Sequence, residues 1–388
     1  MSDNVTPIRP DRTRRFGRKK LIIITAAVCV IVLLAAIVTV AVVNDLRDWG
    51  AVQRYFRYRN AASEEGFGTY SFDAQARQFT AFDSGLAVAS RTGVQLLSDS
   101  SQELSETHAN LASPALRSSG AWVLLGDLGG STVALQHATR GEVLKLETEQ
   151  PVLDLDLAET GAFCYIAAEG KYKAVIPVYS AEQELVYEWY SASAYFNQCA
   201  ISPDGTQFAA VRIGQQDAAF VSTLCLFDTS SEGILAELPL GDVLVYELKY
   251  LSSNTICALT ENGLIFVSDS AEERGRLDPA GTIEACDFGA GFAAAWIDSG
   301  MAGQKPNLCV LAPDGEIREV LEVTGTLLSF DVCGGYIAVL TTTGLSIYNE
   351  SLRTVATTTE TGASASVLLR EDGTCILIGG GSAALYIP

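Results

Sequence analysis

Short apolar stretches separated by polar turns recur through most of this chain. The clearest copy is Ile201–Val211, in which Pro203-Asp204-Gly205 stands between two runs of β-prone apolar residues. Proline presets the backbone at the second position of a turn, aspartate can bond its own backbone, and glycine accepts a positive φ. The stretch therefore predicts a strand, a tight turn and a second strand.

A turn followed by an apolar strand recurs eight times between residue 67 and the end of the sequence. Each copy is marked by the residue before its second strand, namely Gly85, Gly120, Gly161, Gly205, Asn254, Gly291, Gly335 and Gly373. The markers are 35 to 49 residues apart, which leaves room for about four short strands in each unit, as in the blade of a β-propeller. Long helical periods are absent from this region, so the pattern does not fit an alternating α/β fold.

The last of these units is one strand short. After Thr374–Ile378 and Ala383–Ile387 the sequence ends at Pro388, whereas an unassigned strand, Thr69–Asp73, precedes the first complete unit. If both ends of the chain contribute to one blade, the ring closes and its open edges disappear. We therefore predict an all-β protein whose residues 67–388 form a β-propeller of eight four-stranded blades. Seven blades is the alternative if one weak unit is misassigned.

The first 66 residues follow a different pattern. Residues 1–20 are polar and basic, Leu21–Val43 is an uncharged apolar run of 23 residues, and residues 44–66 mix aromatic side chains with arginine. A helix of 23 residues can cross a bilayer, and the excess of positive charge before it keeps that end in the cytoplasm. We predict a single-pass protein of the cell membrane with a cytoplasmic basic tail, a transmembrane signal anchor, a juxtamembrane helix or plain stalk, and an extracytoplasmic propeller. Cleavage of the anchor near Ala35–Ala41 is the alternative.

Charge divides the chain at nearly the same place. Residues 1–60 carry a net charge of +7, and residues 61–388 carry 15 basic and 42 acidic side chains, a net charge of −27. Affinity for nucleic acid comes largely from neutralised phosphates, and anionic lipid headgroups repel an acidic surface. We therefore expect no nucleic-acid partner for the propeller, although a nucleic-acid-binding arm is an alternative for the basic tail, and we expect membrane contact through Leu21–Val43.

Nine cysteines are present, and eight of them lie in the predicted propeller. An even count in an exported domain is typical of disulfides, but these cysteines lie within apolar strand runs, where a free thiol behaves as a small buried side chain. Cys199 and Cys225 would be separated by an intervening strand, as would Cys286 and Cys309, which is too far for a bridge. We expect free, buried thiols.

Residues that could carry chemistry are few. His108 and His137 lie in polar stretches and match no metal-binding pattern, and Gly379–Gly381 joins two strands with no helix after it, so we expect a turn there rather than a phosphate loop. Five carboxylates lie on predicted innermost strands: Asp154, Asp156, Glu247, Asp287 and Asp331. Such groups could bind a cation or act as acid and base, but the simpler interpretation is that they accept hydrogen bonds from turn amides. We predict no catalytic residue, no metal site and no cofactor.

Three hairpins carry a resemblance to known repeats. Ile201–Val211, Pro313-Asp314-Gly315 and Glu371-Asp372-Gly373 resemble the S-P-D-G hairpins of WD40-like and related bacterial propellers. The layout of basic tail, anchor, aromatic-arginine stalk and acidic propeller resembles an uncharacterised family of single-pass membrane proteins from Gram-positive anaerobes, domain of unknown function 5711. The resemblance implies the fold and no activity. Quinoprotein propellers are a poorer match, because only four tryptophans are present.

The candidate binding residues are Lys171, Tyr172 and Lys173. In a propeller, the hairpins between second and third strands emerge on one face with the connections between blades; we call this the loop face. Long loops are predicted there at Glu169–Lys173, Gly214–Ala218 and Ser299–Pro306, and hairpin loops are short unless the extra length has a use. We predict a scaffold that binds a protein or a cell-envelope ligand on this face. The alternatives are a propeller enzyme of the polysaccharide lyase, hydrolase or quinoprotein type acting outside the membrane, and a signalling receptor.

Overall fold

The computed structural model describes residues 29, 32, 49–59, 66–72, 75–76, 78–216, 219–301 and 303–388. Apart from Cys29 and Val32, the predicted tail and anchor lie outside the described residues. Within the described residues, no helix is both long enough and apolar enough to cross a membrane. The chain divides into two compact units, Met1–Gln53 and Arg54–Pro388, and all the strands of the described residues belong to the second.

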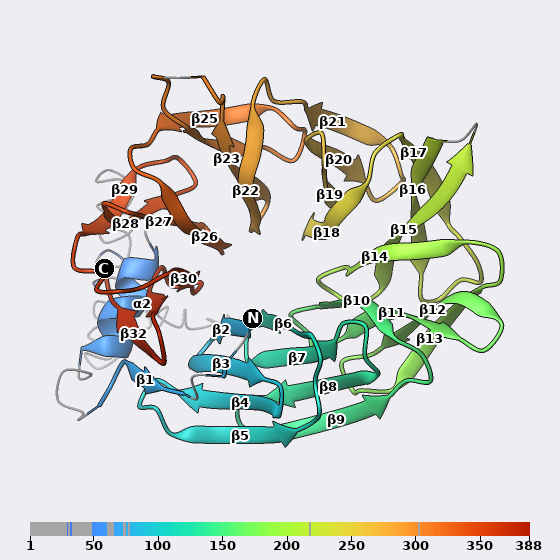
Figure 1. The fold of residues 1–388 in the computed structure, drawn as a ribbon, viewed down its shortest axis with the longest axis horizontal. Coiled ribbons are helices and arrows are strands. Elements are labelled where there is room, and N and C mark those ends of the chain that lie inside the picture. The colour runs from blue at the N-terminus through green and yellow to red at the C-terminus, as the bar shows by residue number, and fades with distance from the viewer. Residues whose placement is uncertain are drawn as a thin grey trace, which may run out of the picture. The chain divides into compact units, whose positions relative to one another are not determined.

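Eight antiparallel sheets of four strands each stand around a ring (Figure 1). In blades 1 to 7 the strands follow the chain from the centre of the ring outward. Blade 1 consists of β2 (Gln78–Phe82), β3 (Gly85–Ser90), β4 (Gly93–Ser98) and β5 (Glu103–His108). Blade 2 consists of β6 (Pro114–Ser119), β7 (Trp122–Asp127), β8 (Thr132–His137) and β9 (Gly141–Glu147). Blade 3 consists of β10 (Val152–Leu157), β11 (Phe163–Glu169), β12 (Tyr172–Tyr179) and β13 (Leu185–Ser191).

The next four blades repeat the same order. Blade 4 consists of β14 (Tyr195–Ile201), β15 (Gln207–Gln216), β16 (Ala219–Asp228) and β17 (Ala236–Gly241). Blade 5 consists of β18 (Val245–Ser252), β19 (Thr255–Thr260), β20 (Leu264–Ser268) and β21 (Glu273–Leu277). Blade 6 consists of β22 (Thr282–Gly289), β23 (Phe292–Asp298), β24 (Asn307–Leu311) and β25 (Ile317–Glu322). Blade 7 consists of β26 (Leu327–Cys333), β27 (Tyr336–Thr341), β28 (Gly344–Asn349) and β29 (Thr354–Thr358).

Blade 8 joins the two ends of the propeller. Its order is β1-β32-β31-β30, so that β30 (Ser366–Leu369), β31 (Cys375–Ile378) and β32 (Ser382–Tyr386) are completed by β1 (Thr69–Ser71) as the outermost strand. Thr69 lies opposite Ala384, and Ser71 lies opposite Ser382. The predictions of eight blades and of one blade shared by both ends are confirmed, and the alternative of seven blades is wrong.

The core of the propeller lies between the blades rather than at the centre of the ring. Side chains of a strand alternate between the two faces of its sheet, so each blade packs against both neighbours. Eight apolar clusters result, one at each blade-to-blade boundary. At the boundary of blades 3 and 4, for example, Ile166 and Ile176 pack with Phe208 and Phe227, whose rings stack 4.5 Å apart.

A buried ion pair joins blade 8 to blade 1. Arg370, which follows β30, is 3% exposed. It donates hydrogen bonds to the Asp99 carboxylate at 2.7 Å, to the Tyr70 hydroxyl at 2.9 Å and to the Gly85 carbonyl at 3.1 Å. Gly85 and Asp99 belong to blade 1 and Tyr70 to β1, so one guanidinium connects three separate segments where the ring closes.

Helix α2 (Trp49–Tyr58) forms inside the region predicted as a stalk. Its last residues belong to the same compact unit as the propeller, and they contact the hairpin of blade 8. The Tyr58 hydroxyl donates to the Asp372 carboxylate at 3.0 Å, the Arg57 guanidinium lies 3.5 Å from the same carboxylate, and Arg54 donates to the Asp372 carbonyl at 2.5 Å. These side chains therefore fix the end of α2 to the blade that closes the ring.

Candidate functional site

Lys171, Tyr172 and Lys173 lie at the hairpin between β11 and β12. The long loop predicted at Glu169–Lys173 is wrong, because the two strands run almost to the tip and leave a turn of Gly170 and Lys171. The long loop predicted at Gly214–Ala218 is also wrong, because β15 continues to Gln216 and β16 begins at Ala219. The backbone hydrogen bonds of a ladder form between polar residues as readily as between apolar ones. A polar stretch of sequence was therefore not enough to predict a loop at these two positions. The long connection between β23 and β24 matches the loop predicted at Ser299–Pro306.

These three residues are part of a cluster with two further tyrosines. The Lys171 ammonium lies 5.3 Å from the centre of the Tyr172 ring, and the Lys173 ammonium lies 4.7 Å from the centre of the Tyr195 ring. The rings of Tyr172 and Tyr190 are 4.8 Å apart. Both ammonium groups are within cation–π range. We call this set the tyrosine–lysine cluster.

The strand order of blades 3 and 4 explains why these residues meet. Val175 pairs with Tyr190 in the ladder between β12 and β13, which places Tyr190 near Tyr172. The chain then passes directly from β13 to β14, whose first residue is Tyr195. Lys173 donates a hydrogen bond to the Ser193 carbonyl in this connection at 3.1 Å. The cluster is therefore built on strand ends that are held by their ladders, and its geometry does not depend on a free loop.

Large aromatic side chains are exposed on the loop face, both in the cluster and outside it. Tyr195 is 57% exposed, Phe220 near the tip of the β15–β16 hairpin is 70% exposed, and Tyr246 near the start of β18 is 56% exposed. All three stand at the strand ends that carry the loop face. Exposed apolar surface on one face of a protein can mark an interaction site. The sequence pattern did not single out these three residues, because each follows or precedes an apolar run and could have been buried.

The innermost strands of five consecutive blades carry a β-bulge near the loop face. In β10, β14, β18, β22 and β26 the ladder skips one residue, and the skipped residues are Leu153, Asn197, Tyr246, Glu284 and Leu328. A bulge turns a side chain away from the direction that strict alternation would give it. Consistent with this, Leu153, Tyr246 and Leu328 are exposed although they belong to innermost strands.

The five predicted carboxylates do lie on innermost strands, and four of them accept hydrogen bonds from the next blade. Asp154 accepts from the Cys199 N–H at 2.8 Å, and Asp156 accepts from the Ile201 N–H at 3.0 Å. Asp287 accepts from the Val332 N–H at 2.8 Å, and Asp331 accepts from the Leu369 N–H. An innermost strand is a sheet edge with unpaired amides. The partners are therefore edge amides of the neighbouring blade and not the turn amides that the sequence suggested.

The charge of these carboxylates is compensated on one side of the ring only. Asp156 lies 2.6 Å from the Lys249 ammonium, and Arg117 lies 3.8 Å from Asp154. For Asp287 and Asp331, the described residues provide no ion pair with a cation. Burial, followed by the charge of Glu247, raises the pKa of Asp287 to about 6, and burial together with Asp287 raises the pKa of Asp331 well above its usual range. The two carboxyls therefore share protons in mildly acidic solution.

Replacing Asp287 with asparagine should stabilise the protein at pH 8. The folded chain holds a proton on Asp287 up to about pH 6, whereas the unfolded chain loses it near pH 4, so stability falls as the pH rises through this window. Asparagine can still accept from the Val332 N–H, and it carries no charge. We expect a free energy of unfolding higher by roughly 1–3 kcal/mol at pH 8 and a flatter pH profile, measured by urea unfolding. Asp156→Asn, which leaves Lys249 unpaired, should instead destabilise; a parallel response of both variants would contradict the assignment.

The described cysteines are free thiols. Cys199 on β14 and Cys225 on β16 are separated by β15, as predicted, and Cys286 and Cys309 are separated by β23. The structure also brings Cys164 of blade 3 against Cys199 of blade 4, a contact that was not predicted because it crosses a blade boundary. Burial raises the pKa of Cys199, Cys257 and Cys286, so these thiols stay protonated. Among the described residues, no three His, Cys, Asp or Glu side chains are placed to hold a metal ion.

Comparison with one solved structure supports the propeller fold. The C-terminal WD40 domain of Sif2 is similar over 83% of this chain and 100% of its own, with a TM-score of 0.55 and 10% sequence identity. Hydrazine synthase from Kuenenia stuttgartiensis overlaps 84% of this chain and 99% of its own, with a TM-score of 0.46 and 13% identity. No curated protein matches the sequence. The model of a family of unknown function (DUF5711) matches residues 54–378, and the chain therefore belongs to that family.

Proposed function

We propose that this protein is a scaffold of the cell envelope, anchored in the membrane by Leu21–Val43, whose propeller binds a protein or a cell-envelope ligand on the loop face. The observation that carries this proposal is the tyrosine–lysine cluster, continued on the same face by exposed Phe220 and Tyr246. The WD40-like fold supports it, because a rigid ring holds side chains at strand ends in fixed positions.

The composition of the cluster suits an interface. Tyrosine offers a large contact area with few rotatable bonds, and tyrosines are enriched among the residues that dominate binding energy. Lys171 and Lys173 lie over tyrosine rings, so their positions are already restricted before a partner arrives and less entropy is lost on binding. They also place positive charge on a domain of net charge −27. This local positive charge can attract acidic groups of a partner and help to fix its position.

The enzymatic alternative would depend on the carboxyls of the innermost strands. Asp154, Asp156, Asp287 and Asp331 each accept a main-chain N–H from the next blade, and this accounts for their positions through pairing of sheet edges. Glu247 has a raised pKa through burial, and it would be the acid on which a propeller enzyme had to rely. The exposed aromatic surface favours the scaffold.

The location outside the membrane is tested by proteolysis of intact cells. If Leu21–Val43 is an anchor with its N-terminus in the cytoplasm, protease added outside should remove a tag at the C-terminus and leave a tag at the N-terminus protected. The same digestion after cell lysis should remove both tags. Protection of the C-terminal tag in intact cells would contradict the proposed orientation.

Docking on the loop face is tested by photo-crosslinking in native cells. A benzophenone amino acid at Tyr195 should form adducts with a defined partner, whereas the same group at Leu185, which is exposed at the opposite end of blade 3, should not. Lys171→Glu, Tyr172→Ala and Lys173→Glu together should reduce the Tyr195 adduct at least tenfold, since loss of one interface tyrosine alone costs about 1–2 kcal/mol.

A matched surface variant controls for this experiment. Leu185→Glu with Val186→Ala changes exposed residues at the other end of the same blade, and it should leave the Tyr195 adduct unchanged. The melting temperature of both variants should stay within a few degrees of the parent protein. Equal adducts from Tyr195 and Leu185, or an adduct that survives the triple substitution, would count against this face.

A further inference from the structure

The outermost strand of blade 7 differs from the other outermost strands of the ring. β29 has the sequence Thr-Val-Ala-Thr-Thr, without a charge or a proline, whereas β5, β9, β13, β17, β21 and β25 each contain at least one charged residue, and β1 has three residues only. Charges, prolines and short length are the usual protection of an exposed sheet edge against added strands. β29 therefore presents an edge without charge or proline. Its one irregularity is a bulge at Val355, between the pairs Ile347–Ala356 and Tyr348–Thr354, and its N–H and C=O groups point outward at alternate residues.

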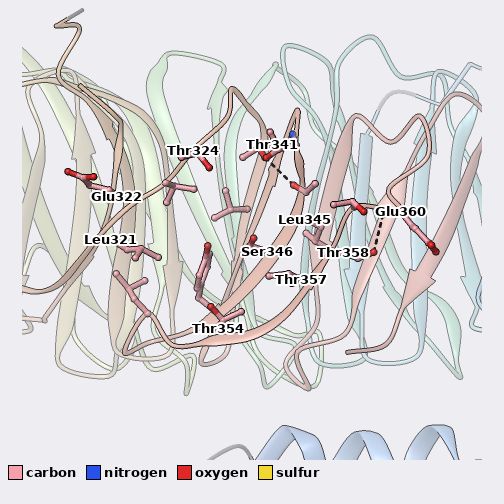
Figure 2. Close-up of a pocket in the computed structure, with 17 residues that line it drawn as sticks. Leu321, Glu322, Thr324, Thr341, Leu345, Ser346, Thr354, Thr357, Thr358 and Glu360 are labelled. Atoms are coloured by element: carbon pink, nitrogen blue, oxygen red, sulfur yellow. Dashed lines mark hydrogen bonds between the residues drawn. The ribbon is translucent and has the colours of Figure 1, made fainter. Parts of the chain in front are cut away.

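A groove of about 620 Å³ lies beside this edge, between blades 6 and 7. Figure 2 shows Leu321 and Glu322 of β25 on one side, and Leu345, Ser346, Thr357 and Thr358 of blade 7 on the other. Seven threonines line the groove: Thr324, Thr341, Thr343, Thr354, Thr357, Thr358 and Thr359. A strand added to β29 would place every second side chain in this groove, because side chains alternate across a sheet.

Several hydroxyls of the groove are available to a ligand. Thr341 is engaged with Thr343 and Gly344, and Thr358 accepts from the Glu360 N–H at 3.1 Å. In the part of the chain that the structure describes, the hydroxyls of Thr324, Thr354 and Thr357 make no hydrogen bond. The groove therefore offers three hydroxyls without a hydrogen-bond partner among the described residues, whereas the packed boundary between blades 6 and 7 is apolar.

The negative charge of the groove favours a ligand that carries positive charge. Glu322 and Glu360 are its charged lining residues, and no lysine or arginine lines it. Glu322 forms an ion pair with Lys305, but the ammonium is 3.9 Å from the carboxylate and both side chains are more than half exposed. A ligand with positive charges would find two carboxylates that lack close partners of their own.

We propose that blade 7 binds an extended, cationic peptide segment of a partner protein, which adds to β29 as a fifth strand and directs alternate side chains into the threonine-lined groove. Strand addition uses the free edge for affinity and the groove for selection of side chains. A second copy of this chain is disfavoured as the occupant, because it would bring the same two glutamates and a further net charge of −27 to the site. A neutral glycan could use the hydroxyls, but it would leave the edge of β29 unpaired. The site is separate from the loop face of blades 3 to 5, and either can fail without the other.

A library of nine-residue peptides tests the proposal on the full-length chain. Retained peptides should be enriched in lysine or arginine at every second position. Thr357→Lys adds a cation to an exposed position of β29, and it should weaken binding of the selected peptides at least tenfold. Leu104→Lys makes the matched change on the outermost strand of blade 1, where Leu104 is exposed, and should leave binding unchanged.

Two further measurements identify the site if Thr357→Lys disturbs folding. Glu322→Gln with Glu360→Gln changes surface charge only, and it should weaken the peptides three- to tenfold, as expected for two exposed ion pairs. Hydrogen exchange of the peptide complex should show new protection of the Thr354–Thr358 amides. The triple substitution in the tyrosine–lysine cluster should not alter peptide binding.

Each contrary outcome overturns the proposal. If the parent protein retains no more peptide than the Thr357→Lys variant does, β29 is not a peptide site. Equal binding to Thr357→Lys and to the parent protein, or protection at another strand, would place the peptides elsewhere. Selection of a neutral glycan from an array, lost in Thr357→Lys, would assign the groove to carbohydrate, and self-association lost in the same variant would assign it to a second copy.

Discussion

Replacement of Arg370 by methionine is expected to lower the free energy of unfolding by about 3–5 kcal/mol. Methionine fills a similar volume, but it removes the hydrogen bonds to Asp99, Tyr70 and the Gly85 carbonyl. The Asp99 carboxylate is only 14% exposed, and it would lose its buried partner. Removal of one member of such a pair is costly because the other charge stays desolvated. Urea unfolding of the full-length variant measures the loss directly.

Two further variants show whether the loss comes from burial of the pair. Arg212 forms a two-bond pair with Glu237 at 2.8 and 3.0 Å, but both side chains are about one-third exposed. Arg212→Met should therefore cost about 1 kcal/mol or less. Adding Asp99→Leu to Arg370→Met should recover part of the loss, because no buried charge remains unpaired. Similar costs for Arg370→Met and Arg212→Met would show that the ring does not depend on this pair.

Replacement of Gly161 by alanine is expected to destabilise the propeller by about 2–5 kcal/mol. Gly161 lies in the turn between β10 and β11 with φ +88°, where a β-carbon is strained by about 1–2 kcal/mol. That β-carbon would also stand 2.4 Å from the indole of Trp122 in blade 2, and overpacking of this kind costs about 1–3 kcal/mol. Both effects act at the boundary of blades 2 and 3, so thermal unfolding should report them together.

Gly291 provides the matched control for this substitution. It occupies the equivalent turn of blade 6 with φ +82°, and a β-carbon there would meet no atom within 4 Å. Gly291→Ala should therefore show the backbone strain alone, about 1–2 kcal/mol. The difference between the two variants measures the contact of the turn with Trp122. Equal costs would mean that Trp122 moves aside freely.

The fold was largely predictable because the signal for each blade is local. The second strand of a blade is covered on both faces, so it appears in the sequence as a continuous apolar run after a turn, as in Thr206–Val211. The shared eighth blade was also predictable, since one strand, Thr69–Asp73, had no unit of its own. These features depend on neighbouring residues and on the count of strands, both of which can be followed along the sequence.

The candidate site was less predictable because it depends on contacts between blades. Asp287 bonds the amide of Val332, which is 45 residues away, and no local pattern contains the register between two innermost strands. Lys173 and Tyr195 meet through the connection from β13 to β14, a proximity that appears only when the ring is assembled. Lys171, Tyr172 and Lys173 were chosen for a long loop that does not exist, and their role in binding stays a prediction. In the structure, Tyr172 and Lys173 contact the exposed Tyr190 and Tyr195.

Because β1 pairs with β32, the propeller can close only late in synthesis. Thr69 pairs with Ala384, so the strand that is made first among the blades waits for one made about 315 residues later, roughly 15–60 s at ordinary rates of synthesis. A nascent chain that has reached residue 380 contains seven complete blades and is still an open ring. The ring closes only when β32 has been made. Until then β1 is unpaired, and an unpaired β1 marks a chain whose ring is still open.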